Sequence, residues 1–156
     1  MRAWFEAQGW TAAPFQREVW KRYLAGESGL LQTPTGSGKT LAAIGGPLLE
    51  ALASAPTPNA SSKPGKRPPT RPPGSLKVLW ITPLRALAVD TTRALRAPIE
   101  ALGLDWVVAM RTGDASARDR RLARSGQADV LVTTPESLSL LQSYADTAPQ
   151  LSQLQC

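Results

Sequence analysis

The fold is decided by one short stretch, Thr33-Pro34-Thr35-Gly36-Ser37-Gly38-Lys39-Thr40. Its last three residues match the phosphate-loop pattern G-x-x-x-x-G-K-[ST], whereas Thr33 stands where the pattern has its first glycine. Gly36 and Gly38 permit backbone conformations that a β-carbon would forbid, so that successive N–H groups can converge on phosphate oxygens. The stretch therefore predicts a nucleoside triphosphate site, with Lys39 on the phosphates and the Thr40 hydroxyl on a phosphate-bound Mg²⁺.

The flanks of this loop have the context that such a site needs. Gly29-Leu30-Leu31-Gln32 is short and apolar, as a buried parallel strand is, and helical spacing follows the loop at Leu41, Ile44, Leu48 and Leu52. A helix N-terminus placed after the loop adds partial positive charge facing the anion. The alternative is a Gly/Ser-rich surface turn that holds one lysine, and it does not require a flanking strand and helix.

Composition bounds the class of protein. A length of 156 residues suits one domain with its own core. Cys156 is the only cysteine and the last residue, so the chain forms no internal disulfide, which favours a reducing compartment. No apolar run approaches a membrane span, and the first residues do not resemble a signal peptide, so we expect a soluble cytoplasmic protein.

Net charge is weak evidence for a nucleic-acid partner. The chain carries +6, but Lys63, Lys66, Arg67 and Arg71 supply +4 from one stretch without acids, which leaves +2 for the remainder. The sequence has no histidine, which excludes imidazole base catalysis and histidine-ligated metal sites.

Composition also suggests how the chain is divided. We expect residues 1–54 to hold an amphipathic helix, the phosphate-loop strand and its helix, residues 76–144 the remainder of the same domain, and 145–156 a truncated tail. Residues 55–75 contain seven prolines, four cations and almost no large apolar side chain, which is typical of a disordered insertion. A linker between two domains is the alternative, but strand and helix patterns resume directly afterwards.

The amphipathic helix contains a candidate adenine ligand. Pro14 suits a first helical turn, Gly26 suits the end, and one face carries Phe15, Val19, Tyr23 and Leu24. The amide of Gln16 offers a donor and an acceptor side by side, which can pair with the N6 and N7 edge of adenine. A surface glutamine on a packing helix is an equally good interpretation.

Strand and helix patterns then alternate, which predicts an α/β fold with a mainly parallel sheet. Strands are expected at 76–81, 106–110 and 128–132. Thr82-Pro83 and Thr134-Pro135 are helix-start signatures in which the threonine caps and the proline opens the helix, and Glu136 suits a positive first turn. The first of these helices should bury Leu84, Leu87, Ala88, Thr91 and Leu95 and break or kink at Pro98.

The turns after these strands form a second candidate site. Carboxyl ends of parallel strands meet at one edge, so the phosphate loop, both Thr-Pro turns and Thr112-Gly113 are expected together. Helix N-termini there can hold the phosphates of a second ligand. Ordinary helix capping explains each turn singly, and Arg118, Arg120, Arg121 and Arg124 are interpreted as a solvated helix face.

Five short motifs resemble, in order, the early motifs of superfamily 2 DExH/DEAD-box helicases: Pro14-Phe15-Gln16, Thr33–Thr40, Thr82–Leu87, Arg111-Thr112-Gly113-Asp114 and Thr133–Leu138. The wording of Trp80–Leu87 and Thr133–Leu141 is similar to large-helicase-related (Lhr-type) proteins, especially the ligase-associated DNA-repair branch. The resemblance implies a RecA-like domain of an ATP-driven motor that moves 3′ to 5′ on single-stranded DNA. ATP and Mg²⁺ would be held by Gln16, Thr35, Gly36, Ser37, Gly38, Lys39 and Thr40, and a nucleic-acid backbone by Pro83, Arg85, Thr112, Gly113, Thr134 and Pro135.

The resemblance also exposes a departure. The family's Asp-Glu-x-His motif, which completes the Mg²⁺ site and positions water, has no counterpart after Glu136. We therefore expect a fragment of the first motor domain with weak or no ATP hydrolysis alone. The adenine-stacking aromatic stays open among Trp4, Phe5 and Trp10. Rival hypotheses are a nucleotide-binding docking module without motor activity, a small-molecule kinase, and a poorly folded fragment.

Overall fold

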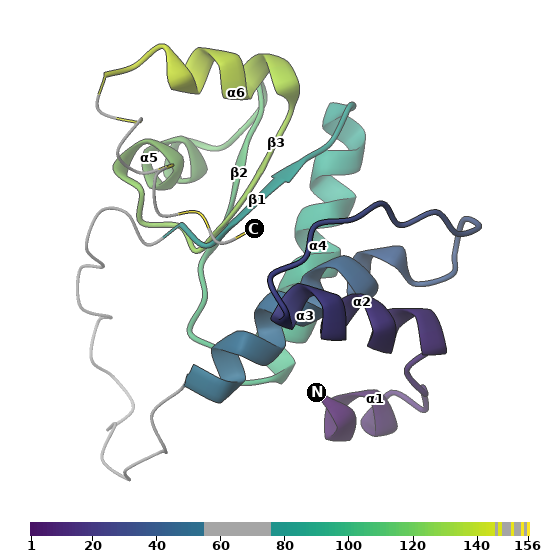
Figure 1. Ribbon diagram of the computed structural model, residues 1–156. Helices are drawn as coiled ribbons and strands as arrows, with labels where there is room; N and C mark the ends of the chain where they lie inside the picture. Colours follow the sequence, from purple (N-terminus) through teal and green to yellow (C-terminus); the bar gives the residue numbers. More distant parts are fainter. Residues whose placement is uncertain (55–75, 146, 148–150, 152–153, 155) are drawn as a thin grey trace, which may run out of the picture. The chain divides into compact units, whose positions relative to one another are not determined.

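The computed structural model describes residues 1–54, 76–145, 147, 151, 154 and 156 (Figure 1). The expected insertion at 55–75 lies outside the described residues. The chain divides into two compact units, one of Met1–Ala53 with Asp90–Asp105 and one of the described residues among Ser54–Val89 and Trp106–Cys156. The boundary falls inside one helix, α4 (Arg85–Ala101).

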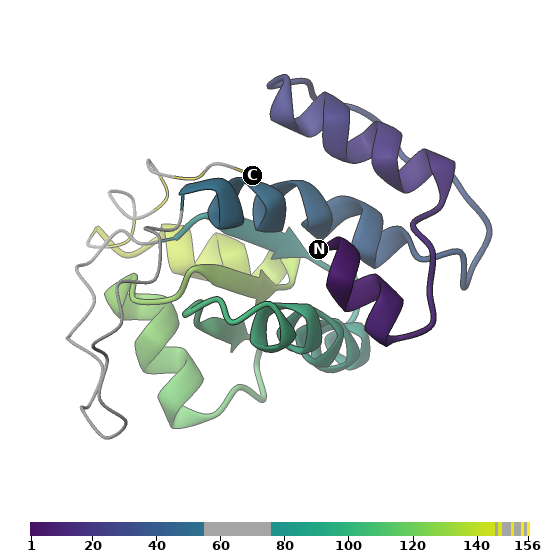
Figure 2. The ribbon, with the colours of Figure 1, turned by 90° about the horizontal axis from the view of Figure 1, so that it is seen from below.

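The first unit begins with three helices, α1 (Arg2–Ala7), α2 (Pro14–Leu24) and α3 (Lys39–Ser54) (Figure 2). The Phe5 ring of α1 is buried and meets Trp4, Trp10 and Trp20 edge-on, with ring centroids 5.3, 6.3 and 5.8 Å away. Edge-to-face packing is a preferred arrangement for aromatic rings. These rings hold α1 and the following turn against α2.

Two glycines of α3 receive the aromatic side chains of α2. A β-carbon at Gly45 would overlap the Trp20 indole, and one at Gly46 would lie 2.5 Å from the Tyr23 ring. The Trp20 indole N–H donates to the carbonyl of Leu41 (3.2 Å), and the Tyr23 hydroxyl donates to Glu50 (2.9 Å). The close approach of α2 to α3 therefore depends on the absence of side chains at Gly45 and Gly46.

The structure confirms a helix from Pro14 to Leu24 and a left-handed Gly26 after it, with φ of 76°. The buried face differs from the predicted one, since Gln16 and Trp20 are buried whereas Leu24 is exposed. The surface of α3 determines which residues of α2 are buried, because Gly45 and Gly46 leave room for the rings of Trp20 and Tyr23.

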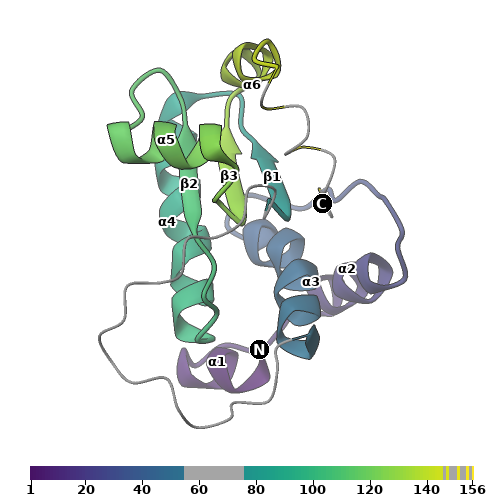
Figure 3. The same ribbon diagram turned by 90° about the vertical axis from the view of Figure 1, so that its left-hand side faces the viewer.

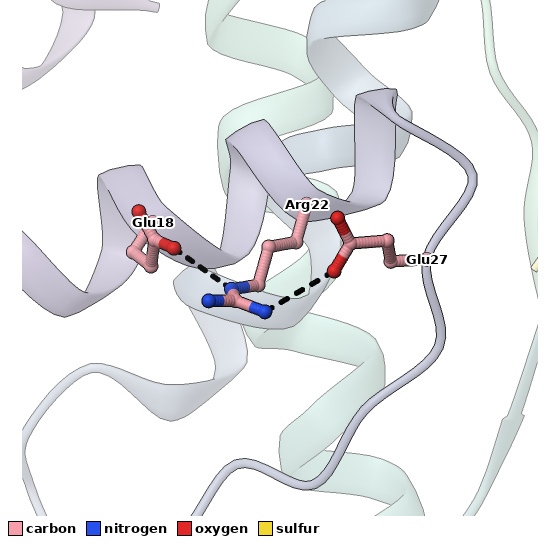
Figure 4. A network of polar contacts seen from close by, with 3 residues as sticks. All are labelled: Glu18, Arg22 and Glu27. Carbon is pink, nitrogen blue, oxygen red and sulfur yellow. Dashed lines mark hydrogen bonds and ion pairs between the residues drawn. The ribbon is translucent and has the colours of Figure 1, made fainter.

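An exposed ion network holds the chain beyond α2 (Figure 4). The Arg22 guanidinium pairs with Glu18 at 2.8 Å and with Glu27 at 3.2 Å. The hydrogen bond that Arg22 donates to Glu18, followed by the charges of the Glu18 and Glu27 carboxylates, raises the pKa of Arg22. Because all three side chains face solvent, the network orients the turn more than it stabilises the fold.

The second unit contains a parallel sheet of β1 (Val78–Ile81), β3 (Val130–Thr133) and β2 (Val108–Arg111), in that order (Figure 3). Helices α5 (Ala117–Ser125) and α6 (Pro135–Gln142) belong to the same unit. β3 lies in the middle, and all four of its residues are buried. These findings confirm the expected α/β class and parallel pairing. At β1 the backbone of Cys156 also pairs, with hydrogen bonds to Lys77 O and from Leu79 N.

The core of this unit is a cluster of small and aliphatic side chains, joined by α5 against β2. Its buried members are Leu76, Ala109, Ala123, Ala128, Leu131 and Leu141. Ser116 caps α5 by accepting from the N–H of Asp119, and Gly126 ends it with a φ of 65°. The cap and the glycine fix the helix length, so α5 covers β2 and leaves its arginines outward.

Asp129 ties the amino ends of the three strands together. One carboxylate oxygen accepts from the N–H of Val107 (2.8 Å) and the other lies 3.4 Å from the Lys77 ammonium. Its carbonyl accepts from the N–H groups of Lys77 and Val78, and Lys77 lies over the Trp106 ring at 5.8 Å. A buried carboxylate with this many partners sets the strand alignment at the amino edge.

One prediction on regular structure is wrong, and of the two outcomes expected at Pro98 the structure excludes the break, while a kink stays a prediction. Residues 29–32 form no strand and Leu30 is 93% exposed, since a strand requires a hydrogen-bonding neighbour and no described strand pairs with this segment. Pro98 does not break α4, which continues to Ala101 with the proline buried inside it.

The helix after β1 also starts later than predicted. It begins at Arg85, and the Thr82 hydroxyl donates to the Leu84 carbonyl (3.1 Å) instead of capping. Leu84 and Leu87 are exposed, and the buried residues of α4 include Ala88, Thr92, Leu95 and Ile99. In contrast, α6 begins as predicted, with Thr134 at the cap position and Pro135 first in the helix, although the Thr134 hydroxyl donates to Ser137. None of the described helices is long and apolar enough to cross a membrane.

Replacing Asp129 by alanine should lower the free energy of unfolding by about 1–3 kcal/mol, because the part-buried N–H of Val107 loses its acceptor. Asp129→Asn keeps an acceptor oxygen and should lose less. The measurement is the urea midpoint by circular dichroism, with exposed Asp90→Ala as the matched control. Equal midpoints for Asp129→Ala and Asp90→Ala would contradict the role of Asp129.

Candidate functional site

The glycine-rich loop closes on the side chain of its own lysine. The Lys39 ammonium donates to the carbonyl oxygens of Thr33 (2.8 Å) and Pro34 (2.7 Å), and the hydroxyls of Thr33 and Ser37 lie 2.7 Å apart. Gly36 and Gly38 have φ of 79° and 90°, values that side chains disfavour. The loop is thus already curled around a cation, and a charged phosphate oxygen is a stronger acceptor for that cation than a neutral carbonyl.

Gln16 connects α2 to this loop. Its buried amide nitrogen donates to the Gly38 carbonyl (3.1 Å), and its oxygen accepts from the N–H of Ala13 (2.9 Å). A β-carbon at Gly38 would lie 2.7 Å from that nitrogen, so the glycine makes room for the amide as well as adopting a positive φ. Pairing of Gln16 with adenine would exchange one or both of these partners, and it stays a prediction.

The remaining predicted ligands of the nucleotide lie around the same turn. Thr35 is exposed in the loop, Ser37 is half-buried, and Thr40 is half-buried as the second residue of α3. In the part of the chain that the structure describes, no three acidic, histidine or cysteine side chains gather around a common point. The role of Thr40 as a ligand of a phosphate-bound Mg²⁺ stays a prediction.

The exposure of their rings distinguishes the three aromatic residues that could stack on adenine. Phe5 is buried among the rings that join α1 to α2, so neither of its faces is free for a base. Trp4 is half-buried, whereas Trp10 is 50% exposed. Trp10 has the most accessible aromatic ring of the three candidates.

Three turns share the carboxyl edge of the sheet (Figure 1). Ile81, Thr133 and Arg111 are opposite one another at the ends of their strands, so the segments after them start side by side. The Thr133 hydroxyl donates to the Arg111 carbonyl (2.7 Å), and Thr133 O accepts from the N–H of Thr82 (2.9 Å). The predicted convergence of both Thr-Pro turns with the Thr112-Gly113 turn is therefore confirmed. The phosphate loop belongs to the other unit, and its place at this edge stays a prediction.

Arg85 is the cationic centre of this edge. Its guanidinium lies against Gly113 and 3.5 Å from the Asp114 carboxylate. The charge of Arg85 also acts on Glu136. The pKa of Glu136 is lowered first by a hydrogen bond with its own backbone N–H, next by the Thr134 hydroxyl and last by the charge of Arg85. The sequence motifs include Arg85, Asp114 and Glu136 separately, but they did not predict that the two carboxylates lie near Arg85. The available signal was that each carboxylate lies in or within two residues of one of these turns.

The predicted nucleic-acid residues differ in access to a ligand. Pro83, Arg85, Gly113 and Pro135 are exposed, whereas Thr112 and Thr134 are 1% and 3% exposed. The two threonine side chains shape the turns from within. A ligand on this surface would meet Arg85, the prolines and the backbone of the turns.

The fold is that of a known class of protein. The sequence model of the DEAD/DEAH box helicase family matches residues 13–156, and the chain belongs to that family. Among its relatives, the Lhr helicase/probable uracil glycosylase of Mycolicibacterium smegmatis is 35% identical over 92% of this chain and 9% of its own length. The ATP-dependent helicase Lhr-Core of Methanocaldococcus jannaschii is 29% identical over 99% of this chain and 18% of its own length.

Comparison with solved structures supports the same family and fold. The structure of the Mycobacterium smegmatis helicase Lhr bound to ssDNA and AMP-PNP superposes with a TM-score of 0.71 at 33% identity, covering 97% of this chain and 18% of that one. The helicase MrfA bound to DNA and AMPPNP gives a TM-score of 0.71 at 23% identity, covering 96% and 19%, and supports the fold alone. The chain thus has the RecA-like α/β fold of Lhr-type helicases and spans about a fifth or less of these relatives.

Proposed function

We propose that this chain is the N-terminal, ATP-binding part of an ATP-dependent 3′ to 5′ DNA helicase of the ligase-associated, Lhr-type repair branch. The observation that carries the proposal is the Lys39 ammonium held inside a turn with two left-handed glycines. Such a turn followed directly by the N-terminus of α3 suits a triphosphate, because backbone N–H groups and helix dipole both favour anions.

ATP is held in this proposal by the whole loop. The N–H groups of residues 35–40 would surround the phosphates, Lys39 would exchange its two carbonyl partners for phosphate oxygens, and the Thr40 hydroxyl would supply one ligand of the Mg²⁺ ion. Gln16 and Trp10 bind the adenine, the first by its amide and the second by stacking. The relative from Mycobacterium smegmatis has AMP-PNP in its structure, which supports an ATP ligand here.

Single-stranded DNA is gripped at the carboxyl edge of the sheet. Arg85 contacts phosphate, Pro83 and Pro135 flank the strand, and Gly113 with the backbone of Thr112 and Thr134 lines it. Contacts of this kind hold a backbone without selecting a base sequence. The structure of the Lhr relative contains ssDNA, which supports single-stranded DNA as the ligand of this chain.

Hydrolysis and unwinding require more than these residues. An ATP-hydrolysing site needs an acid for Mg²⁺ and a group that positions water, and a second motor domain supplies the charge that closes over the nucleotide. We assign both to a longer protein, so that this chain binds ATP and DNA and turns over little ATP alone.

Lys39→Ala should weaken binding of Mg²⁺–AMP-PNP by roughly 10- to 150-fold, the range given by losing charge-assisted hydrogen bonds. Isothermal calorimetry measures the affinity, and exposed Lys21→Ala on α2 is the charge-matched control. A wild-type chain that is folded yet gives no heat with the nucleotide would refute the ATP site. Mg²⁺-dependent turnover that Lys39→Ala abolishes would contradict the expected lack of hydrolysis.

Trp10→Ala should weaken AMP-PNP binding by roughly 5- to 150-fold, because stacking on a base contributes about 1–3 kcal/mol. Inorganic tripolyphosphate has no base, so its affinity should be the same for the variant and the wild type. Competition calorimetry with both ligands makes the comparison. A parallel loss for both ligands would mean that Trp10 supports the fold and does not stack on adenine.

Binding of a fluorescent oligothymidylate should weaken with salt, with a log–log slope of about −0.7 for each phosphate contacted. Arg85→Gln should make this slope shallower by about 0.7, whereas exposed Arg93→Gln should leave it unchanged. Fluorescence anisotropy between 50 and 200 mM salt, roughly the range over which such contacts are lost, measures both. A chain that binds AMP-PNP and ignores the oligonucleotide would instead favour a nucleotide-binding docking module without motor activity.

A further inference from the structure

The guanidinium of Arg85 occupies the space where a β-carbon of residue 113 would lie. A β-carbon on Gly113 would lie 2.9 Å from Cζ and Nη2 of Arg85 and 3.1 Å from Nη1. Gly113 is not among the glycines with positive φ, so its backbone does not itself require glycine. A side chain at position 113 would therefore displace the flexible guanidinium of Arg85, while the backbone of the turn would be unaffected.

An anion already faces the guanidinium there. Asp114 Oδ2 lies 3.5 Å from Arg85 Nη1, and the two side chains remain 78% and 66% exposed. Across the edge, the charge of Arg85 also reaches the carboxylate of Glu136 at the start of α6. Guanidinium recognises carboxylate and phosphate oxygens in the same planar fork geometry, so these acids offer Arg85 the type of partner that a nucleic-acid backbone offers.

We propose that the Asp114 carboxylate occupies the position on Arg85 that a nucleic-acid phosphate takes when a strand binds. Gly113 provides the surface against which the guanidinium lies while it exchanges the carboxylate for the phosphate. The inference rests on the proposed nucleic-acid grip and adds its regulation. Without a strand, Asp114 holds Arg85 extended across the turn. When a strand arrives, its phosphate displaces the carboxylate, and Asp114 restores the pair when the strand leaves.

The exposure of the pair makes this exchange feasible. An ion pair in water is weak, so a phosphate can displace it without a large penalty, whereas a buried pair would block the site. Gly113 and Asp114 are thus positioning residues for Arg85. Asp114 lowers affinity for the strand while keeping the arginine directed at it.

A double-mutant cycle on the 156-residue chain tests this, with fluorescein-labelled oligothymidylate as the probe and anisotropy at low salt as the readout. Asp114→Asn should tighten binding by about two- to fivefold, the range expected for releasing an exposed ion pair. The same change in an Arg85→Gln background should have almost no effect. Asp90→Asn removes one negative charge from α4, away from the turn of Asp114, and is the matched control.

Gly113→Ala provides the second arm. Its methyl group should push the flexible guanidinium off the turn, which weakens binding in the Arg85 chain and not in the Arg85→Gln chain, with an unchanged thermal midpoint. Gly29→Ala is the control, because nothing lies within 4 Å of a β-carbon there and its φ is not positive.

The outcomes separate the two proposals. Equal tightening by Asp114→Asn with and without Arg85, tightening by Asp90→Asn of the same size, or no effect of Asp114→Asn would overturn the exchange and leave the grip intact. A wild-type chain whose binding does not depend on Arg85, or that does not bind the probe, would overturn the proposed grip and this inference together.

Discussion

Parallel pairing of β3 with both of its neighbours is the constraint on which the candidate nucleic-acid site depends. The register places Ile81, Thr133 and Arg111 side by side, so each strand ends at the same level. Polar turns that are far apart in the chain therefore begin at one edge, and the Thr133 hydroxyl links that edge to the end of β2. A register shift of one residue in any strand would turn its side chains to the opposite face of the sheet. The contacts of Asp129 with Val107 and Lys77 oppose such a shift, because they align the amino ends of the strands.

The charged groups at the two ends of this sheet differ in burial and in pairing. At the amino end the Asp129 carboxylate is buried, and its acceptors are used by Val107 and Lys77. At the carboxyl end the charged groups are exposed and paired only weakly, as Arg85 and Asp114 are. The strands are therefore aligned at the amino end, where the Asp129 carboxylate is shielded from water. A ligand can exchange at the carboxyl edge, where water competes for the charged groups. The glycine loop of the other unit follows a related logic, since Lys39 is held by neutral carbonyls that a phosphate can replace.

Local patterns predicted the elements that local forces determine. The strands of the sheet, the Pro14 start and Gly26 end of α2, and the Thr134-Pro135 start of α6 follow from apolar runs and capping chemistry. The errors arose where tertiary partners decide. Residues 29–32 have the composition of a strand but no described strand beside them, and Leu24 is exposed because α3 accepts rings instead. Exposure of Pro83, Arg85 and Gly113 fits the predicted ligands, whereas the burial of Thr112 and the Asp114 contact depend on packing that periodicity does not encode.

The most direct test of the shared edge is a nuclear magnetic resonance titration of the isotope-labelled chain with oligothymidylate. The account predicts that amide resonances of Arg85, Gly113 and Thr134 shift together along one binding curve, while those of Lys77, Val107 and Asp129 at the amino ends of the strands stay in place. Shifts confined to the amino ends, or different binding curves for the three turns, would contradict a single phosphate-binding edge.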